Sequence, residues 1–159
     1  LPEEGLRRGL AHLQAAEFLY ETRLFPDLEY TFKHALTHEV AYGGLLHDRQ
    51  RALHARLAEA IERLATERLA EQAERLAHHA LRGELWEKAV AYLRQAGLRA
   101  MARAANREAM AHLEQALAAL RRRPETRETT ELTIDIRIDI RNALQPLGGE
   151  LSALDPAAQ

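Results

Sequence analysis

Residues 49–123 place apolar side chains at helical spacing almost without interruption, and this pattern limits the fold more than any other feature of the chain. Residues three and four positions apart lie on the same side of an α-helix, so each run of the pattern predicts one amphipathic helix. The runs cover residues 53–64, 69–80, 86–104 and 106–120. Gly83 stands at a helix-ending position, Asn106 at a capping position, and Pro124 ends the fourth helix. The short connections predict that consecutive helices are antiparallel neighbours.

The composition favours a helical chain and argues against several other classes. Only 5% of the 159 residues are aromatic, and the abundant Ala, Leu, Arg and Glu are good helix formers. The formal net charge of -2 predicts no general attraction to nucleic acid or to anionic lipid. No apolar run reaches the length of a membrane span, so no membrane partner is expected. The absence of cysteine excludes disulfides and thiolate metal sites, and it fits a cytoplasmic protein.

Residues 1–46 have a different pattern. A helix is expected over residues 3–16, followed by alternating apolar and polar side chains over 17–33, which predict an antiparallel hairpin. The dipeptide Pro-Asp at 26–27 supplies the turn. At His34 the period changes to that of a second helix. Helix, turn, hairpin and helix form the end of a winged-helix domain, so we place a domain boundary after residue 46.

The segment 132–141 fits two secondary structures. Its isoleucines alternate strictly, as in a strand, but Leu132, Ile136 and Ile140 also continue as a helical stripe. We favour a helix, because a single strand after four helices would have no partner. In a helix, Ile134 and Ile138 lie off the main stripe and need a second surface to cover them. They are therefore a predicted interaction surface, with self-association through this end of the array as the expected result.

The segment from Leu93 to Ala116 resembles the helix-turn-helix pattern of a tetratricopeptide repeat, with small residues where the two helices meet. The signature aromatic of the first helix is missing, and the neighbouring segment 69–96 does not repeat at the family period. Residues 47–159 are therefore expected to form a tetratricopeptide-like array that is truncated at its C-terminus. Each pair of helices in such an array buries its apolar face against its neighbours.

Several stretches together carry a family resemblance. "YTFKHALTHEVAYGGLL", "RALHARLAEAIE", "LAEQAERLAHHALRGELWEKAVAYLRQAG" and "NREAMAHLEQALAAL" resemble the part that follows the ATPase module in bacterial STAND-class predicted ATPases. Many of those proteins carry a class III adenylate or guanylate cyclase domain, then a P-loop ATPase, a winged helix and tetratricopeptide-like repeats. The resemblance implies a regulatory scaffold within a signalling protein. Its repeats would sense a partner protein and hold or release the nucleotide-binding module.

The same resemblance gives His34 a specific role. In related switch ATPases of the plant-resistance and apoptosome type, a histidine near the start of the last winged-helix helix reaches the β-phosphate of ADP. "FKHAL" places His34 in a similar position, although Ala35 replaces the acidic residue that follows in that motif. An imidazole N–H at a helix N-terminus is chemically suited to a phosphate oxygen. The alternative is that His34 is an ordinary solvated or packed residue at the start of a helix.

A metal site is a rival explanation for the same histidine. His34 and His38 are four residues apart, so two imidazoles share one face of a helix, but the order does not match the HExxH motif of zinc proteases. Adjacent histidines such as His78 and His79 point about 100° apart on a helix and are poorly placed to chelate together. No metal site is therefore expected. The chain also lacks a phosphate-binding loop, a nucleophile elbow and a cysteine nucleophile, so neither catalytic residues nor a cofactor are predicted.

A winged helix also raises the possibility of a transcriptional regulator whose helical array binds an effector. The predicted wing, residues 17–29, holds Arg23 as its only cation beside four acidic residues. This balance is unfavourable for contact with a phosphate backbone, so nucleic acid is not expected as a partner. We therefore expect an all-α chain with an N-terminal winged-helix remnant. Its expected function is non-catalytic regulation through protein contacts, either with an ATPase module or with a partner protein.

Overall fold

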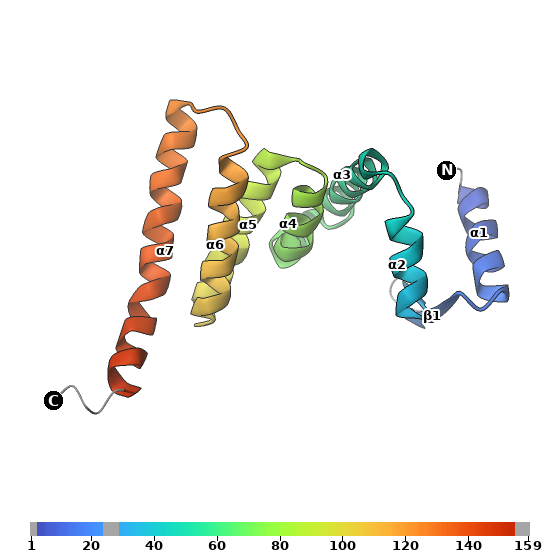
Figure 1. Cartoon of the computed structure of the whole chain (residues 1–159), viewed down its shortest axis with the longest axis horizontal. Helices are drawn as coiled ribbons and strands as arrows, with labels where there is room; N and C mark the ends of the chain where they lie inside the picture. The colour runs from blue at the N-terminus through green and yellow to red at the C-terminus, as the bar shows by residue number, and fades with distance from the viewer. Residues whose placement is uncertain (1–2, 24–28, 155–159) are drawn as a thin grey trace. The chain divides into compact units, whose positions relative to one another are not determined.

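The computed structural model describes residues 3–23 and 29–154, and within them it is mostly helical with one two-stranded antiparallel hairpin (Figure 1). The elements are, in order, α1 (Glu3–Ala15), β1 (Leu19–Arg23), β2 (Glu29–Phe32), α2 (Ala35–Gly43), α3 (His47–Leu64), the 3-10 helix η1 (Thr66–Gln72), α4 (Ala73–Arg82), α5 (Trp86–Ala102), α6 (Asn106–Leu120) and α7 (Arg127–Leu154). The chain divides into two units, Leu1–His47 and Asp48–Gln159.

The first unit contains the predicted hairpin. β1 pairs with β2 in antiparallel register, with Leu19 opposite Phe32, and the register shifts between Glu21 and Arg23. The predicted turn at 26–27 lies outside the described residues. Glu17 takes a left-handed backbone conformation with φ 59° where the chain leaves α1, and its carboxylate accepts a hydrogen bond from Lys33 at 2.6 Å. This contact joins the two ends of the hairpin.

The described residues of the first unit form almost no core. Leu19 is buried, but α1 and α2 have no buried residue. Many large apolar side chains are exposed instead, namely Leu6, Leu13, Phe18, Tyr20, Leu36, Val40 and Leu46. The unit therefore presents much apolar surface for its size, which is common where a protein contacts another protein surface.

The second unit has its core between consecutive helices. α4 packs on α5, α5 on α6 and α6 on α7, as Figure 1 shows for the last three helices. Leu93, Leu113 and Ile136 contribute one fully buried side chain each from α5, α6 and α7. Around them the core is mostly alanine, which lets the helix backbones approach closely. At Gly97 the helices α5 and α6 approach closely, because a Cβ built on it would lie 2.8 Å from Cγ of Leu113.

Gly83 follows the last residue of α4 as its C-cap, as the sequence predicted, but the backbone conformation of the turn differs from that of a glycine cap. At the end of α4 the residue with positive φ is Glu84, at 55°, while Gly83 has an ordinary φ of -83°. Gly83 is required for a different reason, because a Cβ there would lie 2.8 Å from the backbone nitrogen of Ala55 on α3. At the end of α5, Ala104 has φ 60°. The N–H of Ala105 bonds back to the carbonyl of Ala100 at 2.9 Å, which completes a Schellman-type helix end.

Two further sequence expectations were wrong in detail. Asn106 was expected to cap α6, but it is the first helical residue, and Ala105 occupies the cap position without a side-chain hydrogen bond. The run 69–80 was expected to be one helix. Its first part belongs to η1, because Arg68 leaves the helical backbone region with φ -126°, and α4 starts only at Ala73.

The ambiguous segment 132–141 lies within the helix α7, as we expected. The helix begins with a reciprocal cap. The N–H of Thr129 bonds to Oγ1 of Thr126 at 3.2 Å, and the N–H of Thr126 bonds to Oγ1 of Thr129 at 2.8 Å. Ile136 is completely buried in the array. Helical periodicity prevails here because it gives one isoleucine face a packing partner in α6.

Candidate functional site

His34 lies at the N-terminal cap of α2, the position that the sequence pattern indicated. Its backbone is extended, with φ -130° and ψ 133°, and its carbonyl accepts a hydrogen bond from the N–H of Thr37 at 3.0 Å. The side chain is exposed and makes no capping hydrogen bond. His34 therefore presents its imidazole to solvent at the start of a helix, where first-turn N–H groups favour anions.

His38 is also exposed, but unlike His34 its imidazole contacts aromatic rings. Its ring centroid lies 5.4 Å from that of Phe32 and 6.0 Å from that of Tyr42, and the His38 and Tyr42 rings are stacked. These contacts hold the imidazole among aromatic side chains of the hairpin and of its own helix. Neither His34 nor His38 belongs to a group of three or more potential metal ligands within the described part of the chain.

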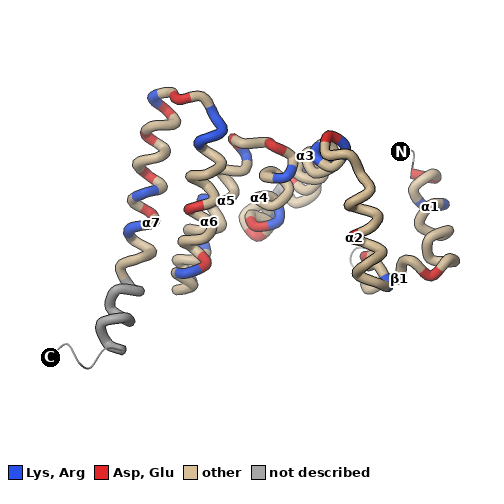
Figure 2. Tube along the Cα trace, in the orientation of Figure 1, with Lys and Arg blue, Asp and Glu red and all other residues tan. Residues whose placement is uncertain are grey.

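The predicted interaction surface lies on the outer side of α7. Ile134 is 54% exposed and Ile138 is 44% exposed, whereas Ile136 between them is completely buried. Asp139 accepts a hydrogen bond from Arg94 of α5 at 2.8 Å, which fixes the rotation of α7 on the array. Figure 2 shows Lys and Arg interspersed with Asp and Glu along the described part of α7. The predicted interaction surface therefore consists of two exposed isoleucines surrounded by side chains of both charges.

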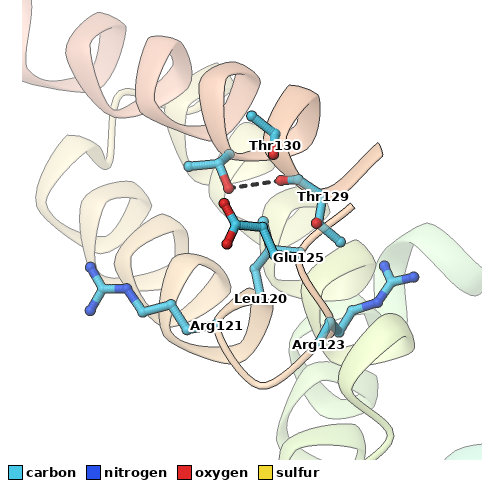
Figure 3. A pocket seen from close by; sticks show the side chains of 7 residues that line it. Leu120, Arg121, Arg123, Glu125, Thr129 and Thr130 are labelled. Carbon is cyan, nitrogen blue, oxygen red and sulfur yellow. Dashed lines mark hydrogen bonds between the residues drawn. The ribbon is translucent and has the colours of Figure 1, made fainter. Parts of the chain in front are cut away.

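A pocket of about 320 Å³ lies where α6 passes into α7 (Figure 3). Its lining includes Leu120, Arg121, Arg123 and Thr133. Figure 3 shows the guanidinium groups of these two arginines on opposite sides of the pocket. Arg123 also forms an ion pair with Glu87 at 3.7 Å. The polar groups of this pocket do not converge on one ligand position, so it does not form a recognisable anion site.

The structure brings together three histidines that sequence reasoning had set aside. His54 of α3 and the adjacent pair His78 and His79 of α4 form a cluster, with ring centroids 5.1 to 5.8 Å apart. Nδ1 of His54 and Nδ1 of His79 are hydrogen bonded at 2.8 Å. His54 is buried, His79 is partly buried and His78 is exposed. One potential ligand nitrogen from each residue lies within 4.8 Å of the others.

Burial keeps the inner part of the histidine cluster neutral. Burial, together with repulsion from the protonated forms of His54 and His78 and from Arg75, lowers the pKa of His79 to about 4. Burial also lowers the pKa of His54, to which His78 and Arg82 add electrostatic repulsion. Neutral imidazoles carry the lone pair that binds a metal ion or accepts a hydrogen bond.

Sequence reasoning missed this cluster because its members come from different helices. His54 lies on α3, twenty-four residues before His78, and the 3-10 helix η1 separates α3 from α4 in the sequence. The adjacent pair was judged in isolation, as two side chains that diverge. The available signal was Gly83, whose missing Cβ allows α3 to approach the end of α4.

Comparison with known proteins identifies no relative, since no family model, no curated protein and no solved structure matches this chain. Among the described helices, none combines the length and apolar character that crossing a bilayer requires.

Proposed function

We propose that this chain is a non-catalytic regulatory segment that acts through protein contacts, and that its second unit is a tetratricopeptide-like array. The main support for the proposal is that α7 carries apolar side chains on two different faces. One face buries Ile136 in the array, and another exposes Ile134 and Ile138. In a stack of helices each apolar face is covered by the next element, so this outer face fits another apolar helix.

The occupant that we propose for this face is the α7 surface of a second copy of the chain. Isoleucine pairs of like size can interdigitate across a helix contact. The mixed signs of charge along α7 avoid the repulsion that a helix of one charge would cause. The chain would then dimerise through one end of its array.

The test is sedimentation velocity over a range of concentrations, comparing the native chain with Ile134→Glu/Ile138→Glu. The native chain is expected to show a reversible dimer that the double variant abolishes, because carboxylates buried in a contact lose hydration. The matched control is Gln115→Glu/Ala118→Glu, which places two carboxylates on exposed positions of α6. A native chain that stays monomeric, or a control that dissociates equally, would overturn the proposed dimer. Circular dichroism of all variants monitors folding.

The position of His34 supports a second element of the same proposal. An exposed imidazole at the start of α2 suits contact with a phosphate of a nucleotide bound by the ATPase module that the STAND resemblance implies. In the multidomain protein, His34→Ala is expected to weaken ADP retention and to raise basal ATP hydrolysis. The control is His12→Ala, an exposed histidine on α1. Unchanged ADP affinity in His34→Ala would remove this role and leave the array as a docking scaffold.

A further inference from the structure

We propose that His54, His78 and His79 form a binding site for a divalent transition-metal ion, with zinc as the reference ion. This site is independent of the proposed dimer surface on α7. It rests on the convergence of three imidazoles from two helices, one of them buried, at separations suited to a shared ion.

The geometry of the cluster is close to that of a three-histidine zinc site. Zinc–nitrogen bonds of about 2.0–2.1 Å in a tetrahedral arrangement place two ligand nitrogens roughly 3.3 Å apart. The nitrogens of His54 and His79 are 2.8 Å apart, and each potential donor atom lies within 4.8 Å of the other two. The inner pair must therefore open by about half an ångström, and the outer imidazole must close by at most about 1.5 Å. Such shifts are within the reach of side-chain rotation.

In His54 and His79 the two Nδ1 atoms, which would bind the ion, already face each other. In the hydrogen bond between His54 and His79, one Nδ1 carries the proton and the other offers its lone pair. When an ion enters, that proton moves through solvent to Nε2 of the same ring, and both Nδ1 lone pairs face the metal. Both rings stay neutral in this exchange, so no net proton is released. His78, which is exposed, provides the third ligand and the route of entry, and water fills the fourth position.

The helices hold these ligands on a rigid support. Gly83 lets the backbone of Ala55 approach the end of α4, which sets His54 against the face that carries His79. On α4, Leu76 and Ala80 are completely buried in the array. Two of the three ligands thus lie on a helix that is packed in the array, and His54 is held beside them by the approach at Gly83, so little ordering is needed when the ion binds.

The ligand type of the cluster selects the class of ion. Arg75 and Arg82 lie near enough to lower the pKa values of His79 and His54, so the local potential is positive and weakens the binding of any cation. The group offers three imidazoles and no carboxylate, so an ion that depends on oxygen ligands, such as magnesium or calcium, is disfavoured there. Ions that form strong bonds to neutral imidazole, such as zinc, nickel and copper, are favoured.

A second group of potential ligands, Glu74, Glu108 and His112, is a poorer candidate. The guanidinium of Arg103 lies 3.4 Å from the carboxylate of Glu74 and 2.5 Å from that of Glu108. An arginine therefore already supplies the positive charge between these carboxylates. His112 consequently serves as a control residue for the three-histidine site.

The test is zinc binding by the full chain, measured by metal analysis after dialysis and by titration calorimetry. The native chain is expected to retain one zinc ion, and magnesium is expected not to compete. His78→Ala removes an exposed ligand, so the variant should fold normally and bind zinc more than about 100-fold more weakly. His79→Gln should have the same effect. Long-range ¹H–¹⁵N spectra of the native chain should show coordination shifts at the Nδ1 atoms of His54 and His79.

The controls separate this site from other histidines. His34→Gln/His38→Gln removes the pair at helical spacing, and His112→Gln removes the second group, and both variants are expected to retain zinc. If the native chain retains no zinc, or if His78→Ala and His79→Gln bind it as the native chain does, the site does not exist. Loss of zinc in a control variant instead would assign the metal to that other group and likewise overturn the proposal.

Discussion

The contact of Gly97 with Leu113 gives the sharpest test of the packing between α5 and α6. A Cβ at position 97 would lie 2.8 Å from Cγ of Leu113, 3.0 Å from its Cδ2 and 3.3 Å from the carbonyl oxygen of Ala109. Carbon atoms pack best at about 3.5–4.0 Å, so Gly97→Ala requires the helices to separate by about 0.7 Å or Leu113 to change rotamer. Leu113 is completely buried, which leaves it little room to move.

The expected cost follows from two opposing effects. Overpacking a well-filled core costs about 1–3 kcal/mol, whereas alanine stabilises a helix interior by about 0.5–1 kcal/mol relative to glycine. Gly97→Ala should therefore lower the free energy of unfolding by about 1 kcal/mol. The assay is urea denaturation followed by circular dichroism. Ala91→Gly, at an exposed position of the same helix, measures the propensity effect alone and should cost about 1 kcal/mol.

A double variant separates the steric contact from other causes. Leu113→Ala alone is expected to cost about 2–5 kcal/mol, because it leaves a cavity. In Gly97→Ala/Leu113→Ala the new methyl group enters that cavity, so the combined loss should be smaller than the sum of the single losses by about 1 kcal/mol or more. Strict additivity, or a stabilising Gly97→Ala, would refute the close approach of the two helices.

Three further predictions concern the turns, the cap and the histidine cluster. Ala104→Gly should raise the free energy of unfolding by about 1 kcal/mol in urea denaturation, because glycine adopts the φ of 60° found there without steric cost. Thr126→Ala should lower it by about 0.5–2 kcal/mol, since the cap of α7 loses its acceptor for the N–H of Thr129, and an unchanged midpoint would contradict that cap. The pKa of His79 is about 4 in the folded chain and 6.5 in the unfolded chain, so the unfolded chain binds the proton more tightly. With a chelator present, the free energy of unfolding should therefore fall as the pH is lowered from 6.5 toward 4. His79→Gln should reduce this pH dependence, and an unaltered slope would show that His79 does not cause it.

Local sequence patterns predicted most of the helical elements because packing in this chain is largely between neighbours. The stripes around Leu93 and Leu113 each mark a helix whose buried face contacts the next helix along the chain. The segment around Ile136 was predicted to be a helix for the same reason, because only a helix could pack its apolar side chains against the preceding helix. The helix ends were predicted less well. Glu84 and Ala104 adopt positive φ without being glycine, so residue type alone could not identify the residues with left-handed backbone conformation.

Of the candidate sites, the sequence predicted the one that lies on a single helix and missed the one that joins two helices. Helical spacing was enough to predict that Ile134 and Ile138 share an outer face, and both are exposed. The histidine cluster depends on the contact of two helices, which no single helical stripe encodes. Gly83 was predicted to end a helix, and it is the C-cap of α4, but no sequence signal indicated that it also permits the approach of Ala55. The role of His34 depends on a nucleotide and stays a prediction.

The most direct measurement of the central claim uses the absence of cysteine from the native chain. A single Ile138→Cys substitution places one thiol on the outer face of α7, and Ala118→Cys places one on the exposed face of α6 as a control. If α7 pairs with α7 of a second copy, mild oxidation should cross-link Ile138→Cys into a dimer much faster than Ala118→Cys. Equal and slow cross-linking of the two variants would show that the outer face of α7 is not a contact surface between copies, contrary to the account.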